Sequence, residues 1–249
     1  THCEWLARPF QSAIERYESL MGEGQWPCYV LGNHDVTRPA TRYAKSEEDD
    51  DRLKVAATML LTMRGTPFIY YGDEIGQRDI TIHKKEEVLD PIGKSFWPFF
   101  KGRDGCRAPM QWNAELNAGF STGKPWLPVH ENHTHRNVVA QADDPQSLLN
   151  FYRELLKLRK ASLAFQKGEV RMLIEKPQFI MAYERKHEEE TFLILLNFSR
   201  FERNLEISEI GPSEIWHPVL STHQPVALVY QAGKLTLKGN QALILKKNE

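Results

Sequence analysis

Two short apolar segments, joined by one helix, constrain most strongly what the first part of this chain can fold into. The segments are Cys28–Leu31 and Thr66–Tyr71, and a glycine follows each of them. Residues 46–65 between them start with acidic side chains and continue with apolar residues spaced three or four apart, which predicts a helix. Strand, helix and strand in this order predict a βαβ unit with two buried, parallel strands. Two strands alone do not make a stable sheet, so we interpret this part as an incomplete α/β domain.

The remainder of the sequence divides into four kinds of segment. Apolar spacing predicts helices over residues 1–21 and from residue 145 to about 160, and residues 33–44 are predicted to form a loop. Residues 77–144 are rich in proline and glycine and lack periodicity, and a connection of this length is typically either functional or carries small elements of its own. Short alternating or β-branched runs after residue 162 predict an antiparallel β-sandwich. We therefore predict two domains, 1–162 and 163–249.

Charge and composition exclude several classes of function. The 249 residues carry 32 Lys and Arg against 33 Asp and Glu, a net charge of −1. This balance lacks the excess of positive charge that would favour binding to nucleic acid or to an anionic membrane. No apolar run is long enough to span a bilayer. Three cysteines without a CxxC pair favour free thiols in a reducing compartment, so the predicted location is cytoplasmic. The chain starts at Thr1 within a helical pattern, and we expect it to be the C-terminal part of a longer or processed protein.

Chemically active side chains follow both predicted strands. In parallel α/β folds, functional groups gather at the carboxyl ends of strands, where this chain has Asn33-His34-Asp35 and Asp73-Glu74. A histidine beside a carboxylate can hold sugar hydroxyls, although Asp35 could equally satisfy backbone N–H groups of a turn. For Asp73 and Glu74 a tight turn between two glycines is the favoured interpretation.

Several blocks of sequence, taken in order, are more specific than any single motif. The chain resembles the α-glucosidase branch of the α-amylase family of glycoside hydrolases in VLGNHDVTR, TPFIYYGDEIG, GRDGCRAPMQW, GFS, PWLPV, NVVAQ and DDPQSLLNFYRELLKLRK. The resemblance implies that residues 1–162 are the C-terminal portion of a (β/α)8 TIM barrel, with Cys28–Leu31 and Thr66–Tyr71 as its seventh and eighth strands. It also implies retaining cleavage of α-glucosidic bonds in oligosaccharides such as maltose or isomaltose.

The resemblance further implies a role for four residues. Asp35 matches the carboxylate that binds ring hydroxyls and supports the oxocarbenium-like transition state, and His34 matches a histidine that donates to the same sugar. Arg107 matches an arginine that reaches the subsite of the non-reducing end, and Arg103 is a second candidate for that role. No metal site is predicted in this chain, because the histidines of HENHTHR lie in a polar loop without the spacing of a known site.

The sequence also departs from the family pattern. The nucleophile and the acid/base carboxylate of the family lie at the fourth and fifth barrel strands, and neither motif occurs in these residues. We therefore expect the chain alone to be inactive, with no cofactor, and any calcium loop of the parent protein to lie outside it. The alternative is a non-catalytic barrel relative, of the kind found as heavy-chain subunits of amino-acid transporters. The choice between α-1,4 and α-1,6 bonds, and between hydrolysis and isomerisation, stays open.

Overall fold

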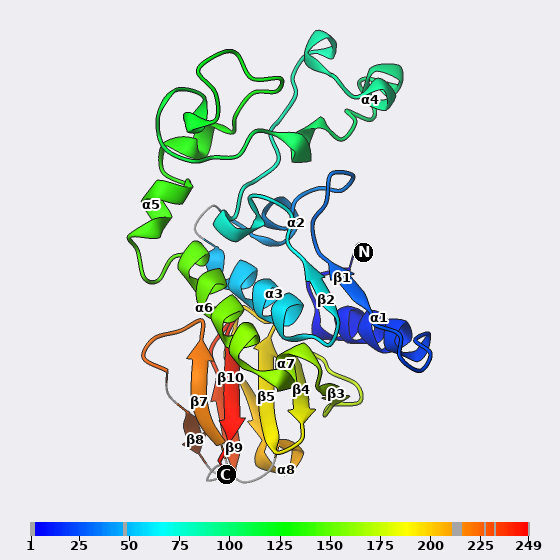
Figure 1. Cartoon of the computed structure of the whole chain (residues 1–249), viewed down its shortest axis with the longest axis vertical. Coiled ribbons are helices and arrows are strands. Elements are labelled where there is room, and N and C mark those ends of the chain that lie inside the picture. Colours follow the sequence, from blue (N-terminus) through cyan, green and yellow to red (C-terminus); the bar gives the residue numbers. More distant parts are fainter. Residues whose placement is uncertain (1–2, 47–48, 211–215, 227, 232, 249) are drawn as a thin grey trace. The chain divides into compact units, whose positions relative to one another are not determined.

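The structure is a computed structural model and describes residues 3–46, 49–210, 216–226, 228–231 and 233–248 (Figure 1). By compactness the chain divides into two units, which are described separately. Unit 1 comprises Thr1–Tyr29, Lys54–Pro67 and Glu154–Glu249, and unit 2 comprises Val30–Leu53 and Phe68–Arg153. The units do not follow the division at residue 162, which remains a prediction about domains.

The first part of the chain is mainly helical. It contains α1 (Ala7–Ser19), β1 (Cys28–Val30), α2 (Pro39–Tyr43), α3 (Asp50–Thr62), β2 (Thr66–Phe68) and α6 (Leu148–Ala161). Helices α1, α3 and α6 lie where the apolar spacing predicts them. The prediction of a continuous loop over residues 33–44 was wrong for α2, because Pro39 occupies the first helical position, where its fixed φ and missing N–H are tolerated.

Strands β1 and β2 pair with each other in a two-stranded sheet. The prediction that both strands are buried was wrong. Cys28 of β1 is exposed, the Phe68 side chain of β2 is 56% exposed, and Tyr71, which follows β2, is 37% exposed. Within the described residues, no third strand joins this sheet. Its apolar side chains therefore stay in contact with solvent.

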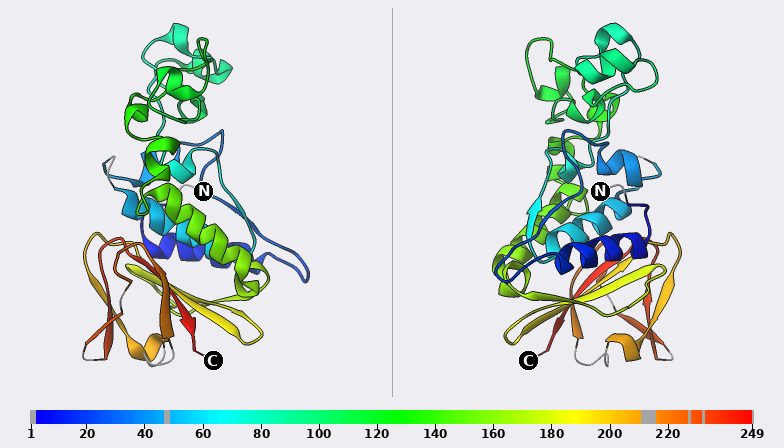
Figure 2. Two further views of the ribbon diagram at one scale, coloured as in Figure 1. Left: turned by 60° about the vertical axis from the view of Figure 1, so that its left-hand side comes forward. Right: turned by 90° about the vertical axis from the view of Figure 1, so that its right-hand side faces the viewer.

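The stretch between residues 77 and 144 carries only short elements, as the sequence predicts, and belongs to unit 2 (Figure 2). The α-helical ones are α4 (Pro91–Phe96) and α5 (Val138–Ala142). The 3-10 turns of the stretch are η2 (Lys85–Glu87), η3 (Asp104–Arg107), η4 (Leu116–Gly119) and η5 (Glu131–Thr134), and η1 (Asp73–Ile75) directly precedes it. A small apolar cluster of Ile80, Ile82, Val88, Ala108 and Leu127 holds part of the stretch together.

The C-terminal part of unit 1 is built from antiparallel strands. After α7 (Leu163–Gln166), a five-stranded sheet has the order β3-β4-β5-β10-β7, and a three-stranded sheet has the order β6-β9-β8. The strands are β3 (Glu169–Met172), β4 (Ile180–His187), β5 (Glu190–Asn197), β6 (Arg203–Glu206), β7 (Trp216–Ser221), β8 (Val229–Gln231), β9 (Lys234–Leu237) and β10 (Ala242–Lys247), with α8 (Ile207–Ile210) after β6.

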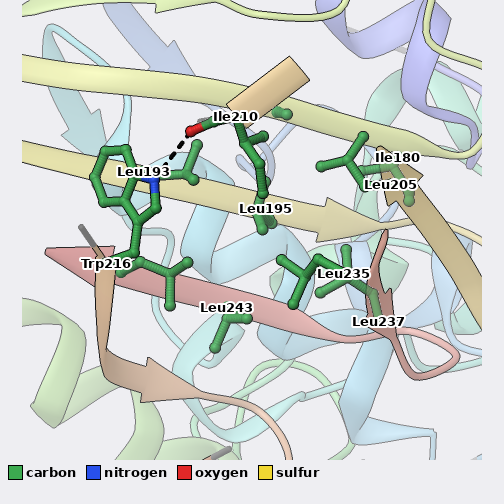
Figure 3. Close-up of a cluster of buried hydrophobic side chains, with 11 residues drawn as sticks. Ile180, Leu193, Leu195, Leu205, Ile210, Trp216, Leu235, Leu237 and Leu243 are labelled. Atoms are coloured by element: carbon green, nitrogen blue, oxygen red, sulfur yellow. Dashed lines mark hydrogen bonds between the residues drawn. The ribbon is translucent and has the colours of Figure 1, made fainter. Parts of the chain in front are cut away.

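One apolar cluster takes side chains from both sheets. Leu193 and Leu195 come from β5 and Leu243 from β10, whereas Leu235 and Leu237 come from β9 of the smaller sheet (Figure 3). The indole N–H of Trp216 donates to the Ile210 carbonyl at 2.9 Å, which satisfies the one polar group of that buried ring.

The five-stranded sheet also contacts helices. Helices α1 and α7 lie beside β4 (Figures 1 and 2), and Phe10 of α1 stacks on Phe198 after β5 with 5.3 Å between ring centroids. At the end of α3, the Thr62 hydroxyl lies 2.6 Å from the Tyr183 hydroxyl of β4. The β-rich tail and these helix segments therefore form one packed body within unit 1.

Candidate functional site

The turn after β1 places Asp35 and His34 at the surface of unit 2. The side-chain oxygen of Asn33 accepts the backbone N–H of Asp35 at 2.8 Å, the short Asx contact that stabilises a turn. His34 Nε2 lies 3.3 Å from Asp35 Oδ2. The side chains of His34 and Asp35 are 67% and 48% exposed, so the turn presents both of them to a solute.

The second half of the site comes from η3, about seventy residues further along the chain. Arg103 immediately precedes this turn and Arg107 ends it. Arg103 Nη1 donates to Asp35 Oδ1 at 3.0 Å and Arg107 Nη2 donates to the same oxygen at 3.2 Å. Arg107 Nε also donates to the His34 carbonyl at 2.8 Å. The structure therefore brings together all four side chains that the sequence analysis singled out.

Arg103 is held by a carboxylate that sequence reasoning missed. Asp90 Oδ2 accepts from Nε of Arg103 at 2.9 Å and Asp90 Oδ1 accepts from its Nη2 at 3.0 Å, a two-pronged pairing of two planar groups. These hydrogen bonds hold the pKa of the buried Asp90 carboxyl well below its usual range and raise the pKa of Arg103. The Asp90-Pro91 dipeptide is a helix-start signal that could have identified this residue as the cap of α4.

Asp104 and Gly102 fix the backbone around Asp90. Asp104 Oδ2 accepts the backbone N–H groups of Leu89 and Asp90 at 2.6 and 3.0 Å. Gly102 has φ +79°, and a Cβ there would lie 2.9 Å from the Asp90 side chain. Glycine is therefore required at this position both for its backbone conformation and for space.

A buried charge cluster lies under the second motif, Asp73-Glu74. The guanidinium of Arg38 is fully buried, donates from Nη1 to the Tyr71 carbonyl at 2.6 Å, and lies 3.9 Å from Asp73 Oδ1. It also stacks over the rings of Tyr70 and Tyr71, 4.8 and 4.7 Å from their centroids. Gly72 and Gly76, at φ +86° and +67°, bracket the turn as the sequence predicts. Arg38 thus joins the turn after β1 to the turn after β2.

Burial raises the pKa of Asp73 from its usual 3.8 to about 7, against the smaller opposing effect of Arg38. The folded state therefore binds this proton more tightly than the unfolded chain does, and the resulting stabilisation is present at low pH and lost as the pH rises through about 7. We expect Asp73→Asn to flatten the pH dependence of the thermal midpoint between about pH 4 and pH 7, the range between the unfolded and folded pKa of Asp73. Unfolding scans of both chains across that range test this, and an unchanged slope in the variant would contradict it.

Comparison with known proteins identifies the class to which this fold and site belong. Residues 3–168 match the family described as "Alpha amylase, catalytic domain". The chain therefore belongs to the α-amylase family, as its sequence motifs predict.

Proteins with sequences similar to this chain include glucosidases. The chain is 41% identical to a probable alpha-glucosidase of Rhizobium meliloti over 70% of its own length and 31% of that protein. It is 34% identical to an oligo-1,6-glucosidase of Parageobacillus thermoglucosidasius over 79% of its length and 39% of that protein. The chain thus spans well under half of these relatives.

The chain is also similar to solved structures of enzymes. The trehalulose synthase MutB from Pseudomonas mesoacidophila superposes with a TM-score of 0.85 at 29% identity, covering 98% of this chain and 47% of that one. An alpha-glucosyl transfer enzyme, XgtA, gives a TM-score of 0.86 at 30% identity, covering 98% and 44%. Mutants of MutB have been solved with glucose and with isomaltulose.

Over the described ranges, no helix is both long enough and apolar enough to cross a membrane. In the same part of the chain, no three His, Cys, Asp or Glu side chains are grouped so that they could share a metal ion.

Proposed function

We propose that this chain carries the sugar-binding side of a retaining α-glucosidase-type active site, acting on α-linked gluco-oligosaccharides such as maltose or isomaltose. The observation that carries the proposal is the convergence of Arg103 and Arg107 on one oxygen of the exposed Asp35 carboxylate. Membership in the α-amylase family and the names of the relatives support the same substrate class.

The proposed roles follow from the charges. Two guanidiniums donate to one oxygen of the Asp35 carboxylate and hold it in place, and its other oxygen, Oδ2, lies beside His34. A carboxylate held in this way can accept hydrogen bonds from hydroxyls of a glucosyl ring. It can also stabilise the positive charge that develops on the ring in the transition state. His34 and the remaining N–H groups of Arg107 and Arg103 supply donors for the same hydroxyls.

Retaining chemistry also needs a nucleophile and an acid/base carboxyl about 5 Å apart. Asp90 and Asp104 are committed to Arg103 and to backbone N–H groups, and Asp73 is buried. We propose that neither of the two catalytic carboxyls belongs to these 249 residues. In the same proposal, β1 and β2 are barrel strands, residues 1–162 belong to the barrel, and residues 163–249 form a β-sandwich.

The test is sugar binding followed by an assay of hydrolysis. Titration of the ¹⁵N-labelled chain with maltose, isomaltose and methyl α-D-glucoside should shift the amides of His34 and Asp35. Asp35→Asn should weaken binding about tenfold or more, because it removes hydrogen bonds to a charged acceptor. The exposed Asp143 supplies the control variant Asp143→Asn, which should bind as the original chain does.

Hydrolysis of p-nitrophenyl α-glucoside by the chain alone should be undetectable. Activity that disappears in Asp35→Asn would show that the chain contains both catalytic carboxyls. An absence of any sugar-dependent shift would contradict the proposal and favour a non-catalytic relative of the transporter heavy-chain type.

A further inference from the structure

Unit 1 contains a pocket that is separate from the candidate site. Its volume is about 600 Å³, and it lies between the start of α1 and the connection from β3 to β4. Arg8 and Ser12 line it from α1, and Lys176, Gln178 and Phe179 line it from the connection, together with three further apolar side chains. A pocket of this volume can hold a small organic ligand and not only a single ion.

Both walls of this pocket are fixed to the body of unit 1. The buried Phe10 of α1 stacks on Phe198 with 5.3 Å between ring centroids. Gln11 Nε2 donates to the Ile174 carbonyl at 2.7 Å, which joins α1 directly to the connection. On the other wall, the Phe179 carbonyl accepts the backbone N–H of Phe198 at 2.9 Å. The pocket is therefore formed by packed elements, and its shape does not depend on a free loop.

The charges that line the pocket have one sign. Arg8 and Lys176 contribute two cations, and no carboxylate is among the described residues of the lining. Glu175, next to Lys176 in the chain, is exposed and lies outside the lining. Neither cation is paired with another residue in the described part of the chain, and the Ser12 hydroxyl and the Gln178 amide add neutral donors. This set of donors favours an anion with several acceptor oxygens.

A phosphate monoester matches this donor set better than a carboxylate does. A phosphate monoester carries a charge of about −1.5 to −2 near neutral pH and three strong acceptor oxygens. A carboxylate has a single charge and would leave one of the two cations without a counter-charge. Arginine and lysine both bind phosphate, the first through its planar fork and the second as a point charge.

Phe179 provides a surface for the ring of a ligand. Its side chain is half-buried, and the guanidinium carbon of Arg203 lies 4.1 Å from the centroid of its ring. Arg203 is not part of the lining, so it holds the ring from outside the pocket. The ring and the apolar side chains beside it form a surface against which a flat ligand ring can pack.

We propose that this pocket binds a phosphate monoester of a small ring compound, with the phosphate at Arg8 and Lys176 and the ring against Phe179. A nucleoside monophosphate and a sugar phosphate share this chemistry. The pocket belongs to unit 1 and the Asp35 carboxylate to unit 2, so this inference does not depend on the proposed glucosidase-type function. A neutral glucoside offers no charge to the two cations.

The experiment measures binding to the full chain by calorimetry, with AMP and glucose 6-phosphate as the two esters. At least one ester should bind about tenfold more tightly than its phosphate-free counterpart, adenosine or glucose, because the phosphate pairs with both cations. The same ester should bind about fivefold more tightly than inorganic phosphate, because its ring contacts Phe179. The ester with the higher affinity identifies the ring as a base or a sugar.

Variants of the lining locate the ligand. Arg8→Ala and Lys176→Ala should each weaken ester binding about tenfold, and both side chains are exposed, so the variants should fold. Arg16→Ala removes an exposed arginine of α1 outside the pocket and is the matched control, with unchanged binding. Phe179→Leu keeps an apolar side chain. It should reduce the affinity for the ester to that for inorganic phosphate and leave phosphate binding itself unchanged.

Three results would overturn the proposal. The first is that both esters bind no more tightly than adenosine and glucose, and the second is that ester binding survives both Arg8→Ala and Lys176→Ala. The third is equal affinity for inorganic phosphate and for both esters, which would exclude a ring contact with Phe179. Ester binding should also be unchanged in Asp35→Asn, and its loss there would place the ligand at the candidate site instead of this pocket.

Discussion

Replacing Arg185 by methionine is expected to lower the free energy of unfolding by about 3–5 kcal/mol, because it leaves several buried carbonyls without donors. Arg185 lies on β4 and is fully buried. Its guanidinium donates to the carbonyls of Gly168 at 2.8 Å, Glu169 at 3.2 Å and Phe165 at 3.3 Å, and also to that of Thr62. Burial lowers its pKa to about 10, so it stays charged near neutral pH.

The carbonyls that Arg185 serves explain the size of the effect. Thr62 ends α3, and Phe165 and Gly168 lie at and just after the end of α7, where helical carbonyls have no intrahelical donor and carry partial negative charge. The one buried guanidinium of β4 therefore supplies hydrogen-bond donors to carbonyls at the ends of both α3 and α7. Methionine has similar length but no donor, so the helix ends lose their partners together.

Urea unfolding followed by circular dichroism measures this effect, with Arg171→Met as the control. Arg171 lies on β3, its side chain is 71% exposed, and it pairs with Glu184 at 2.6 Å. Exposed pairs of this kind contribute about 0–1 kcal/mol. A loss for Arg185→Met no larger than that for Arg171→Met would contradict the role assigned to the buried guanidinium.

Leu195→Ala is expected to cost about 3–5 kcal/mol, the range for a fully buried leucine whose cavity cannot collapse. Leu195 lies on the central strand β5, where it pairs with Ala182 of β4 on one side and Leu243 of β10 on the other, and none of its surface is exposed. Strands on both sides and residues of the smaller sheet hold the surrounding positions, so little relaxation is available (Figure 3).

The control for Leu195 is Leu156→Ala on α6, where the leucine is 42% exposed. The same atoms are removed there, and alanine is itself a good helix former, so the cost should stay below about 1 kcal/mol. Equal losses in thermal or urea unfolding would show that the sheet is loosely packed around Leu195.

Most of the secondary structure could be predicted because its signals are local. Three of the short runs after residue 162 form β4, β5 and β10, and the apolar spacing in residues 46–65 and 145–160 forms α3 and α6. The burial of β1 and β2 could not be predicted in the same way. An apolar sequence shows that a strand favours burial, whereas the neighbours that bury it come from elsewhere in the chain.

The candidate site shows the same division. The sequence motifs singled out His34, Asp35, Arg103 and Arg107 and, through their resemblance to a family, gave them roles that remain to be tested. The motifs did not reveal Asp90, which accepts hydrogen bonds from Arg103, or the buried Arg38, which stacks on the rings of Tyr70 and Tyr71. Both residues look like ordinary surface charges in sequence, because their partners lie 13 and more than 30 residues away.

By itself, the sequence determined the family of this protein and the order of its longer helices and strands, and it placed Asp35 directly after the first of those strands. Each of these depends on residues that are close together in the chain or on motifs that keep their order. Only the tertiary structure decided that Arg103 and Arg107 meet on one oxygen of Asp35, and that Trp112, Phe120 and Trp126 surround one pocket. These contacts depend on the path of a long irregular segment, which is fixed by packing and hydrogen bonds between distant residues and leaves no periodic signal in the sequence.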